Sequence, residues 1–340
     1  MTLEQEPRNP TNCDEGPVER EHRSLPQLRA SLVLTVLNEQ GSIRSLFEGI
    51  QRQTLPLDEI VIVDGGSTDQ TLNLVRRFEV DVAADVTVIV APGANISKGR
   101  NIGVDAASNE LILVTDGGAN LDQNWARHLV ESLSTGADVA CGFFTPQSGD
   151  SFPAILGALT VPILDEIDSI KFLPSSRSVG FTKRAWATVG GYPEWLDYCE
   201  DLIFDIALKD AGFNFAFVPD AQVAWNARST VRGYFKQYFR YGRGDGKACL
   251  WPRRHAIRYC SYGAGLFLVR SGSQGRLLLI MLTAAYLHKF WKRALTRRSS
   301  LGVGGTTRAV LLAVALVPIG DLAKMSGFPI GVCWRWNRKC

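Results

Sequence analysis

Short apolar runs alternate with amphipathic segments along the first half of the chain. Five runs are rich in β-branched and other apolar residues and predict strands, at 31–37, 59–64, 86–91, 110–116 and 137–144. The segments between them carry apolar residues at helical spacing and predict helices, at 42–53, 67–78, 96–107 and 122–133. Strands that alternate with helices over short connections predict right-handed crossovers. The pattern therefore predicts an α/β fold with a mostly parallel sheet and helices on both faces.

Polar residues stand where these strands end. Asn38 and Glu39 follow the first strand, Asp64 ends the second and Asp116 ends the fourth. Ligands of such sheets bind outside the carboxyl ends of the strands, so we expect a site at this edge. We expect Ser67 to cap the helix at 67–78, with Gln70 completing a capping box. The alternative for residues 64–69 (DGGSTD) is a turn that only leads the strand into this capped helix.

Charge divides the chain into two parts. The whole chain has a net charge of +3, from 37 basic and 34 acidic residues. Residues 252–340 hold 15 of the basic residues and one acid, Asp321, which leaves 22 basic and 33 acidic residues in positions 1–251. A strongly basic segment indicates an anionic partner, either a lipid surface or a nucleic acid.

Apolar segments in the basic part favour the lipid surface, and we expect no nucleic-acid partner. These segments are 259–269, 277–287 and 309–320. Each is shorter than the roughly 20 residues of a spanning helix, which predicts interfacial, re-entrant or buried helices. We therefore expect a helical membrane-associating region at 251–340, and a soluble basic helical subdomain is the alternative. Residues 30–250 form the expected catalytic domain.

The remaining features bear on location. Residues 1–29 are polar and lack the apolar stretch of a signal peptide, so we expect a disordered tail. The seven cysteines are scattered, with no CxxC pair, which argues against disulfides and structural zinc. We expect a membrane-associated protein whose catalytic domain lies on the reducing, cytoplasmic side. His128, His255 and His288 share no metal-ligand spacing and are expected to be structural or exposed.

Several ordered motifs together resemble family 2 glycosyltransferases with the A-type nucleotide-sugar fold. They are LTVLNE (34–39), IVDGGSTDQT (62–71), GANISKGRNIG (93–103) and LILVTDGG (111–118). Residues 190–212 are similar to the acceptor-side segment of that family. Residues 237–246 (QYFRYGRGDG) are similar to its Q-x-x-R-W element, with Tyr241 in place of Trp. The resemblance covers roughly residues 30–247, and an ordered set of motifs is more specific than any single one.

The resemblance implies transfer of a sugar from a nucleotide-sugar donor to a hydroxyl acceptor, with inversion. It places Asp64 at the nucleobase and Thr35 in the same pocket. The other implied donor-binding residues are Asn38, Glu39, Lys98, Arg100, Asn101 and Asp116. Cationic and amide donors at the start of a helix suit a diphosphate, although Lys98 and Arg100 also fit a solvated basic turn.

Asp116 corresponds to the first acid of the D-x-D metal motif of the family. Gly118 stands at the position of the second acid, which departs from the family pattern. One carboxylate can still hold Mg²⁺ or Mn²⁺ together with substrate phosphates and water. Asp122 is a weaker second ligand because it also suits a helix cap. Without a metal, Lys98, Arg100 or Arg240 would have to neutralise the departing diphosphate.

Two further motifs carry implied roles. Glu200 and Asp201 resemble the E-D pair in which the Asp is the general base, although two acids in a first helical turn also suit the helix dipole. Gln237 and Arg240 are three residues apart on a helix predicted to begin near Ser229, and with Tyr241 they would contact the acceptor or the diphosphate. Alternating glycines at 242–246 predict a mobile active-site loop.

Three other functions were weighed against this one. Nucleotidyl transfer onto sugar phosphates is disfavoured because LNEQGS stands where that class has a glycine loop, and a dehydrogenase because G-x-G-x-x-G is missing. The incomplete metal motif leaves open a non-catalytic nucleotide-sugar binder, against which the retained Asp201 argues. The basic apolar segment at 251–340 suits an acceptor that is lipid-linked or a polysaccharide at the membrane.

Overall fold

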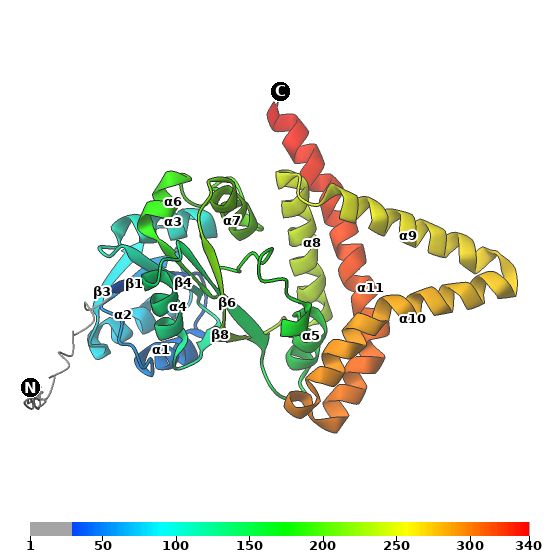
Figure 1. Cartoon of the computed structure of the whole chain (residues 1–340), viewed down its shortest axis with the longest axis horizontal. Coiled ribbons are helices and arrows are strands. Elements are labelled where there is room, and N and C mark those ends of the chain that lie inside the picture. The colour runs from blue at the N-terminus through cyan, green and yellow to red at the C-terminus, as the bar shows by residue number, and fades with distance from the viewer. Residues whose placement is uncertain (1–28, 340) are drawn as a thin grey trace, which may run out of the picture.

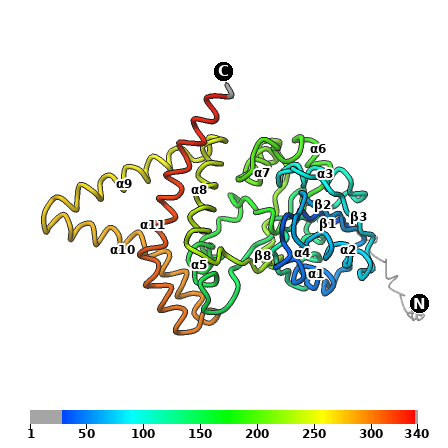
Figure 2. The backbone as a smooth tube through the Cα atoms, turned by 180° about the vertical axis from the view of Figure 1, so that it is seen from behind, coloured from blue at the N-terminus to red at the C-terminus, as the bar shows by residue number. Residues whose placement is uncertain are grey.

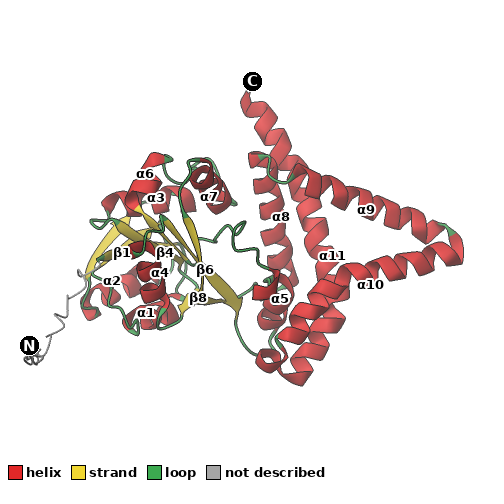
Figure 3. Cartoon of the chain, in the orientation of Figure 1, coloured by secondary structure: helices red, strands yellow, loops and turns green. Residues whose placement is uncertain are grey.

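The computed structural model describes residues 29–339, so the predicted tail at 1–29 lies outside the described residues except for residue 29. Figure 1 shows two parts, a sheet flanked by helices and a layer of long helices beside it. Figure 3 shows that the strands are confined to the first part and that the second part is built from helices and their connections.

One eight-stranded sheet forms the centre of the first part, in the order β3-β2-β1-β4-β7-β6-β8-β5. Neighbours among β1–β4 are parallel, as are β6 and β8, whereas β7 is antiparallel to both β4 and β6. The mostly parallel α/β sheet is therefore confirmed. The strands are β1 (Ala30–Val36), β2 (Glu59–Asp64), β3 (Asp85–Val90), β4 (Leu111–Asp116), β5 (Ala119–Leu121), β6 (Val139–Pro146), β7 (Val179–Thr182) and β8 (Phe215–Trp225).

Helices cover both faces of the sheet because the strand residues alternate between two apolar cores. Leu32 and Leu34 of β1 pack into one core with residues of α1, α2 and α4, whereas Val33 packs into the other with residues of α3 and α7. These helices and the short α6 are α1 (Ile43–Gln51), α2 (Thr71–Asp81), α3 (Ile96–Ala106), α4 (Trp125–Ser134), α6 (Lys183–Thr188) and α7 (Glu200–Asp210).

The predicted capping box at Ser67 is wrong. Helix α2 begins at Thr71, and the backbone N–H of Thr71 donates to Asp69 Oδ1 at 2.9 Å. The Ser67 hydroxyl oxygen instead accepts the backbone N–H of Asn38 at 2.9 Å. The Ser-Thr-Asp cluster thus joins the loops that follow β1 and β2, which helical spacing alone does not reveal.

The second part is a layer of helices that includes two, α5 and α8, from the expected catalytic domain at residues 30–250. Residues of α5 and α8 share an apolar core with residues of α10 and α11. Both views show α9 and α10 as a hairpin that projects away from the sheet (Figures 1 and 2). The bounds are α5 (Phe152–Thr160), α8 (Val231–Ala248), α9 (Pro252–Arg270), α10 (Gly272–Thr296) and α11 (Arg298–Lys339), with a single 3-10 turn at η1 (Leu164–Glu166).

The glycine-rich segment 242–246 is not a loop, so this prediction is wrong. It lies inside α8, and its glycines face neighbouring backbone. A Cβ on Gly242 would collide with the backbone of Lys324, and one on Gly246 with the backbone of Phe328. Small residues let two helices approach closely, and here they join α8 to α11.

The expectation that each apolar segment is too short to span a membrane is wrong for the last of them. Residues 309–320 lie within Arg298–Asn337, one stretch of 40 residues that by length and composition is long and apolar enough to cross a membrane. Of its apolar window, 39% is buried inside the protein. The backbone of α11 departs from helical geometry once, at Gly302 with φ 69°.

Candidate active site

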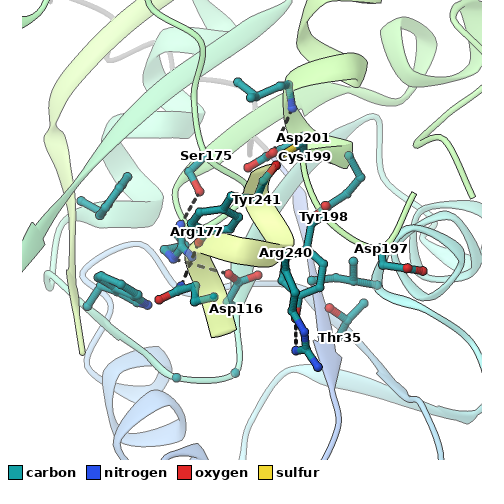
Figure 4. A pocket seen from close by; sticks show the side chains of 18 of the residues that line it. Thr35, Asp116, Ser175, Arg177, Asp197, Tyr198, Cys199, Asp201, Arg240 and Tyr241 are labelled. Atoms are coloured by element: carbon teal, nitrogen blue, oxygen red, sulfur yellow. Dashed lines mark hydrogen bonds and ion pairs between the residues drawn. The ribbon is translucent and has the colours of Figure 1, made fainter. Parts of the chain in front are cut away.

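A cavity of about 1330 Å³ lies at the carboxyl edge of the sheet, between the strands and helices α7 and α8. Thr35 of β1, Asp116 of β4, Asp201 of α7 and Arg240 of α8 all line it. Thr35 and Asp116 are direct neighbours in the β1–β4 register. Figure 4 shows these side chains gathered in one place, although they come from positions more than two hundred residues apart.

Asp64 is a buried carboxylate with one unused oxygen. It ends β2, is 1% exposed, and its neighbours Val63 and Gly65 line the cavity. Its Oδ1 accepts the backbone N–H groups of Gly66 and Ser67, both at 2.8 Å. Its Oδ2 is buried without a hydrogen-bond partner among the described residues. Asp64 itself does not line the cavity. A buried acceptor without a partner is costly, so this oxygen would gain from a hydrogen bond with a ligand that reached it.

Asn38 and Glu39 differ in position. Asn38 has φ 56°, and its Oδ1 accepts the backbone N–H of Thr68 at 2.9 Å, so it joins two loops and does not line the cavity. Glu39 lines the cavity, where its carboxylate accepts the hydroxyl of Ser42. Of the two, Glu39 alone is placed to meet a ligand directly.

Arg100 links two of the expected site acids. Its side chain is 2% exposed, with Nη2 2.8 Å from Asp116 Oδ1 and Nη1 2.7 Å from Glu200 Oε1. The guanidinium carbon lies 5.2 Å from the centre of the Tyr192 ring. Removing one partner of a buried ion pair is strongly destabilising, so Arg100 fixes the end of β4 relative to α7.

The other two residues expected from the same motif lie outside the cavity lining. Lys98 is exposed. Asn101 donates from Nδ2 to the Tyr192 carbonyl at 2.9 Å and accepts the Tyr192 N–H at 2.8 Å. Its amide therefore anchors the segment that leads to α7. Of the three residues expected from this motif, the structure brings only Arg100 into the cavity wall.

The two acids at the start of α7 have different environments. Glu200 is buried and paired with Arg100; burial, and then the neighbouring Asp201 charge, raise its pKa to about 7 against the opposing effect of Arg100. Asp201 is half-buried, and its Oδ1 accepts the backbone N–H of Leu202 at 2.9 Å. Its Oδ2 has no hydrogen bond with a described residue, which leaves this oxygen for a proton from a ligand.

Helix α8 adds the residues of the predicted Q-x-x-R element. Gln237 donates from Nε2 to the Tyr241 hydroxyl at 2.8 Å, and both residues line the cavity. Arg240 donates to the Tyr198 hydroxyl and lies over that ring, 5.2 Å from its centre. The three predicted side chains thus share one wall, and Tyr198 was not expected.

Arg177 is the main site residue that the motifs missed. Its Nε lies 3.7 Å from Asp116 Oδ2, its Nη1 donates to Ser175 at 2.9 Å, and its guanidinium lies 4.8 Å from the centre of the Trp225 ring. Figure 4 shows it beside Asp116. Its one sequence signal is a lone arginine in a run of serines (175–178) directly before the short strand β7.

The residues at the end of β4 do not fit a metal site built by the protein. Asp116 supplies one carboxylate, both of its oxygens face arginines, and Gly118 has no side chain to add. Among residues 29–339, no group of three or more His, Cys, Asp or Glu side chains is placed to hold an ion. We therefore derive no step through a metal ion.

Asp205 is a second buried acid on α7, one turn after Asp201. It is 2% exposed, and its Oδ2 has no hydrogen-bond partner among the described residues. Burial, and then the charge of Asp201, raise its pKa well above the usual value of 3.8. The folded protein therefore holds this proton at pH values where the unfolded chain has released it.

This difference predicts a pH-dependent effect of Asp205→Asn. As pH rises above 3.8, the unfolded chain gains stability by ionising Asp205 whereas the folded protein does not. We expect the unfolding free energy of the variant to exceed that of the parent by an amount that grows with pH, at most about 1.4 kcal/mol per pH unit. Denaturant unfolding at pH 5 and pH 7 measures it. Asp210→Asn, exposed on the same helix, is the control, and a difference that does not change with pH contradicts the prediction.

Comparison with known proteins finds similar sequences. Residues 31–180 match the family described as Glycosyl transferase family 2. The succinoglycan biosynthesis protein ExoA of Rhizobium meliloti is 28% identical over 233 residues, which cover 65% of this chain and 70% of that protein. Glycosyltransferase AglE of Haloferax volcanii is 25% identical over 220 residues, which cover 63% of this chain and 72% of that protein.

Solved structures share the fold. The mannosyltransferase PcManGT from Pyrobaculum calidifontis, in complex with GDP-Man and Mn²⁺, superposes with a TM-score of 0.54 at 16% identity, over 91% of this chain and 88% of that chain. S. aureus TarS 1–349 in complex with UDP-GlcNAc gives a TM-score of 0.50 at 14% identity, over 92% of this chain and 91% of that chain. The match of residues 31–180 to Glycosyl transferase family 2, together with these relatives, supports a glycosyltransferase with a family 2 domain over those residues.

Proposed function

We propose that the protein transfers a sugar with inversion from a nucleotide-sugar donor to a hydroxyl group of an acceptor at a membrane. The observation that carries the proposal is the position of Asp201: it lines the same cavity as Asp116 and Arg177, and its Oδ2 has no hydrogen bond with a described residue. A carboxylate that removes the proton of the attacking hydroxyl is what a single displacement requires.

The donor binds at the strand edge. Asp64 Oδ2 accepts a hydrogen bond from an N–H group of the nucleobase, and this bond supplies the partner that the buried oxygen lacks. Thr35 and Glu39 line the cavity beside it. The carboxylate thereby selects bases that present a donor edge.

The chemistry is one displacement. The acceptor oxygen attacks the anomeric carbon from the face opposite the diphosphate, and Asp201 Oδ2 takes the hydroxyl proton. The bond between the anomeric carbon and the diphosphate oxygen breaks, and the nucleoside diphosphate leaves with the electron pair. Arg177 and Arg240, which both line the cavity, neutralise the charge that develops on the diphosphate.

Substitution of Arg177 and removal of metal ions together test how the charge of the diphosphate is neutralised. We expect Arg177→Gln to lower transfer about 10²- to 10³-fold, the range for loss of one preorganised charge-stabilising group. We expect saturating EDTA to lower it less than about threefold, because the diphosphate charge meets arginines in place of a metal ion. Arg228→Gln, a cavity-lining arginine away from Asp116, is the matched control. Complete loss on chelation that Mn²⁺ restores would contradict this assignment.

The acceptor and its setting form part of the proposal. A relative named for succinoglycan biosynthesis and one named as an O-antigen chain rhamnosyltransferase support an acceptor that is lipid-linked or a polysaccharide. The candidate membrane span in α11 supports transfer at a membrane. Five free cysteines among the described residues agree with a catalytic domain on the cytoplasmic side.

A panel of nucleotide sugars tests the proposal. The full chain in detergent is incubated with UDP-, GDP- and dTDP-linked sugars, and both sugar hydrolysis and thermal stabilisation are measured. One nucleotide class should raise the melting temperature and release its nucleoside diphosphate. If no donor binds or is hydrolysed, the proposed function is wrong.

A further inference from the structure

A second, smaller cavity lies in the helical layer, next to the active site. It has a volume of about 190 Å³ and is lined by residues of α5, α8, α9, α10 and α11. Arg258 and Lys324 line both this cavity and the active-site cavity, so the two adjoin. No motif and no comparison assigns a role to it.

The small cavity is cationic. Arg258, Lys289 and Lys324 line it against one acid, Asp321. Both oxygens of Asp321 are already engaged: Oδ1 accepts from Arg258 Nε at 2.8 Å, and Oδ2 accepts from the hydroxyl of Tyr286 at 2.6 Å. Asp321 therefore compensates Arg258 and forms no ion pair with either lysine.

The two lysines have no ion pair among the described side chains. Lys324 Nζ lies 5.3 Å from the centre of the Tyr238 ring, and Lys289 Nζ lies 5.3 Å from that of Phe290. Lys324 is half-buried, and burial lowers the stability of an ammonium group that has no ion pair. Two ammonium groups and a fixed guanidinium around one cavity make a site for an anion with several oxygens, such as a phosphate.

The surroundings of this site are apolar. The hairpin of α9 and α10 projects from the layer that holds the cavity (Figure 1). Its outward side chains are large and apolar, including Leu266, Phe267, Val269, Leu277, Ile280 and Leu282, all more than half exposed. Many large apolar side chains exposed on one hairpin indicate a contact with lipid or a partner. An anion site at its root suits an amphiphile, with a phosphate head and a hydrocarbon chain.

We propose that Arg258, Lys289 and Lys324 bind the phosphate or diphosphate head group of a lipid-linked acceptor. The lipid chain lies along the α9–α10 hairpin, and the group joined to the head extends through the shared wall at Arg258 and Lys324 toward Asp201. This inference rests on the proposed function and names the acceptor class. It also gives the basic, apolar C-terminal part a role in substrate binding in addition to membrane attachment.

Binding of a prenyl diphosphate by the full chain in detergent micelles tests the proposal. The probes are geranylgeranyl diphosphate, geranylgeraniol and inorganic pyrophosphate, and the variants are Lys324→Gln, Lys289→Gln and the pair. We expect the diphosphate lipid to bind more tightly than either other probe. The pair of substitutions should weaken it roughly 10- to 100-fold, as for loss of charge-assisted hydrogen bonds. Lys236→Gln, an exposed lysine of α8 that lines neither cavity, should leave it within about twofold.

Other sources of phosphate give different results. If the lysines served bilayer lipid alone, the pair would lose binding to vesicles of phosphatidylcholine and phosphatidylglycerol as strongly as to the prenyl diphosphate, which would overturn the proposal. Equal affinity for inorganic pyrophosphate and the prenyl diphosphate would overturn it too, as would an unchanged affinity in the double variant with an unchanged melting temperature.

Donor hydrolysis separates this inference from the proposed function. Lys289→Gln should hydrolyse the nucleotide sugar at the parent rate, because Lys289 lines the small cavity and not the active-site cavity. A parent enzyme that hydrolyses no nucleotide sugar refutes the proposed function. The lysine-dependent affinity for the prenyl diphosphate is measured without any donor and tests the head-group site by itself.

Discussion

Asp201→Asn is expected to lower the rate of sugar transfer by about 10²- to 10⁴-fold, the usual contribution of a general base. Asparagine keeps the shape of the side chain, and its Oδ1 still accepts the Leu202 N–H. What it loses is the oxygen that takes the acceptor proton. Steady-state kinetics with saturating donor and acceptor measure the effect, which should fall on kcat and leave donor affinity within about threefold.

The matched control is Asp210→Asn, at the exposed C-terminal end of the same helix. It removes the same charge from α7 without touching the cavity, and we expect it to keep more than half of the parent activity. Transfer by Asp201→Asn at the parent rate would remove Asp201 from the role of base. Glu200 would not replace it, because its carboxylate is paired with Arg100.

Asp64→Asn is expected to weaken binding of the nucleotide-sugar donor by about 10- to 100-fold. A buried N–H group that faces another N–H group has no acceptor, which costs roughly 1–3 kcal/mol. The asparagine Oδ1 can keep the bonds from Gly66 and Ser67. Its Nδ2 takes the place of Oδ2, the buried oxygen without a partner, and so presents a donor to the nucleobase N–H. Calorimetric titration with the matching nucleoside diphosphate measures the loss.

A comparison between ligands sharpens this result. Affinity for the nucleoside alone should fall by the same factor, because Asp64 is assigned to the base and not to the phosphates. Asp81→Asn, exposed at the end of α2, should leave both affinities unchanged. If Asp64→Asn binds the nucleoside as tightly as the parent does, its place in the donor site is wrong.

Much of the fold was predictable because it depends on local periodicity. The strand and helix alternation up to residue 144 agrees with the observed elements, and the doubly covered sheet follows from it. The order of the later strands was not predictable. β7, 33 residues after the end of β6, inserts between β4 and β6 as an antiparallel strand, and no pattern within β7 specifies that neighbour.

Glycine composition was misleading for a related reason. Alternating glycines predict a flexible loop when they are considered alone. In the folded chain Gly242 and Gly246 face α11, about eighty residues later, and Gly244 faces Tyr198; these close approaches keep the segment helical. The benefit of a missing Cβ depends on the partner surface, which the local sequence does not contain.

The sequence by itself determined the sheet edge and the acids on it, because a strand that ends in a carboxylate before a glycine is a local feature that parallel pairing brings to one edge. Asp64 and Asp116 were named from it, whereas Asp201 was named from the resemblance of residues 200–201 to the E-D pair. Only the tertiary structure decided how they are used: it put Arg100 between Asp116 and Glu200, brought Arg177 to Asp116, and joined a cationic cavity to an apolar hairpin. Those arrangements are contacts between residues tens to more than a hundred positions apart, and their energies come from burial and charge pairing that exist only in the folded chain.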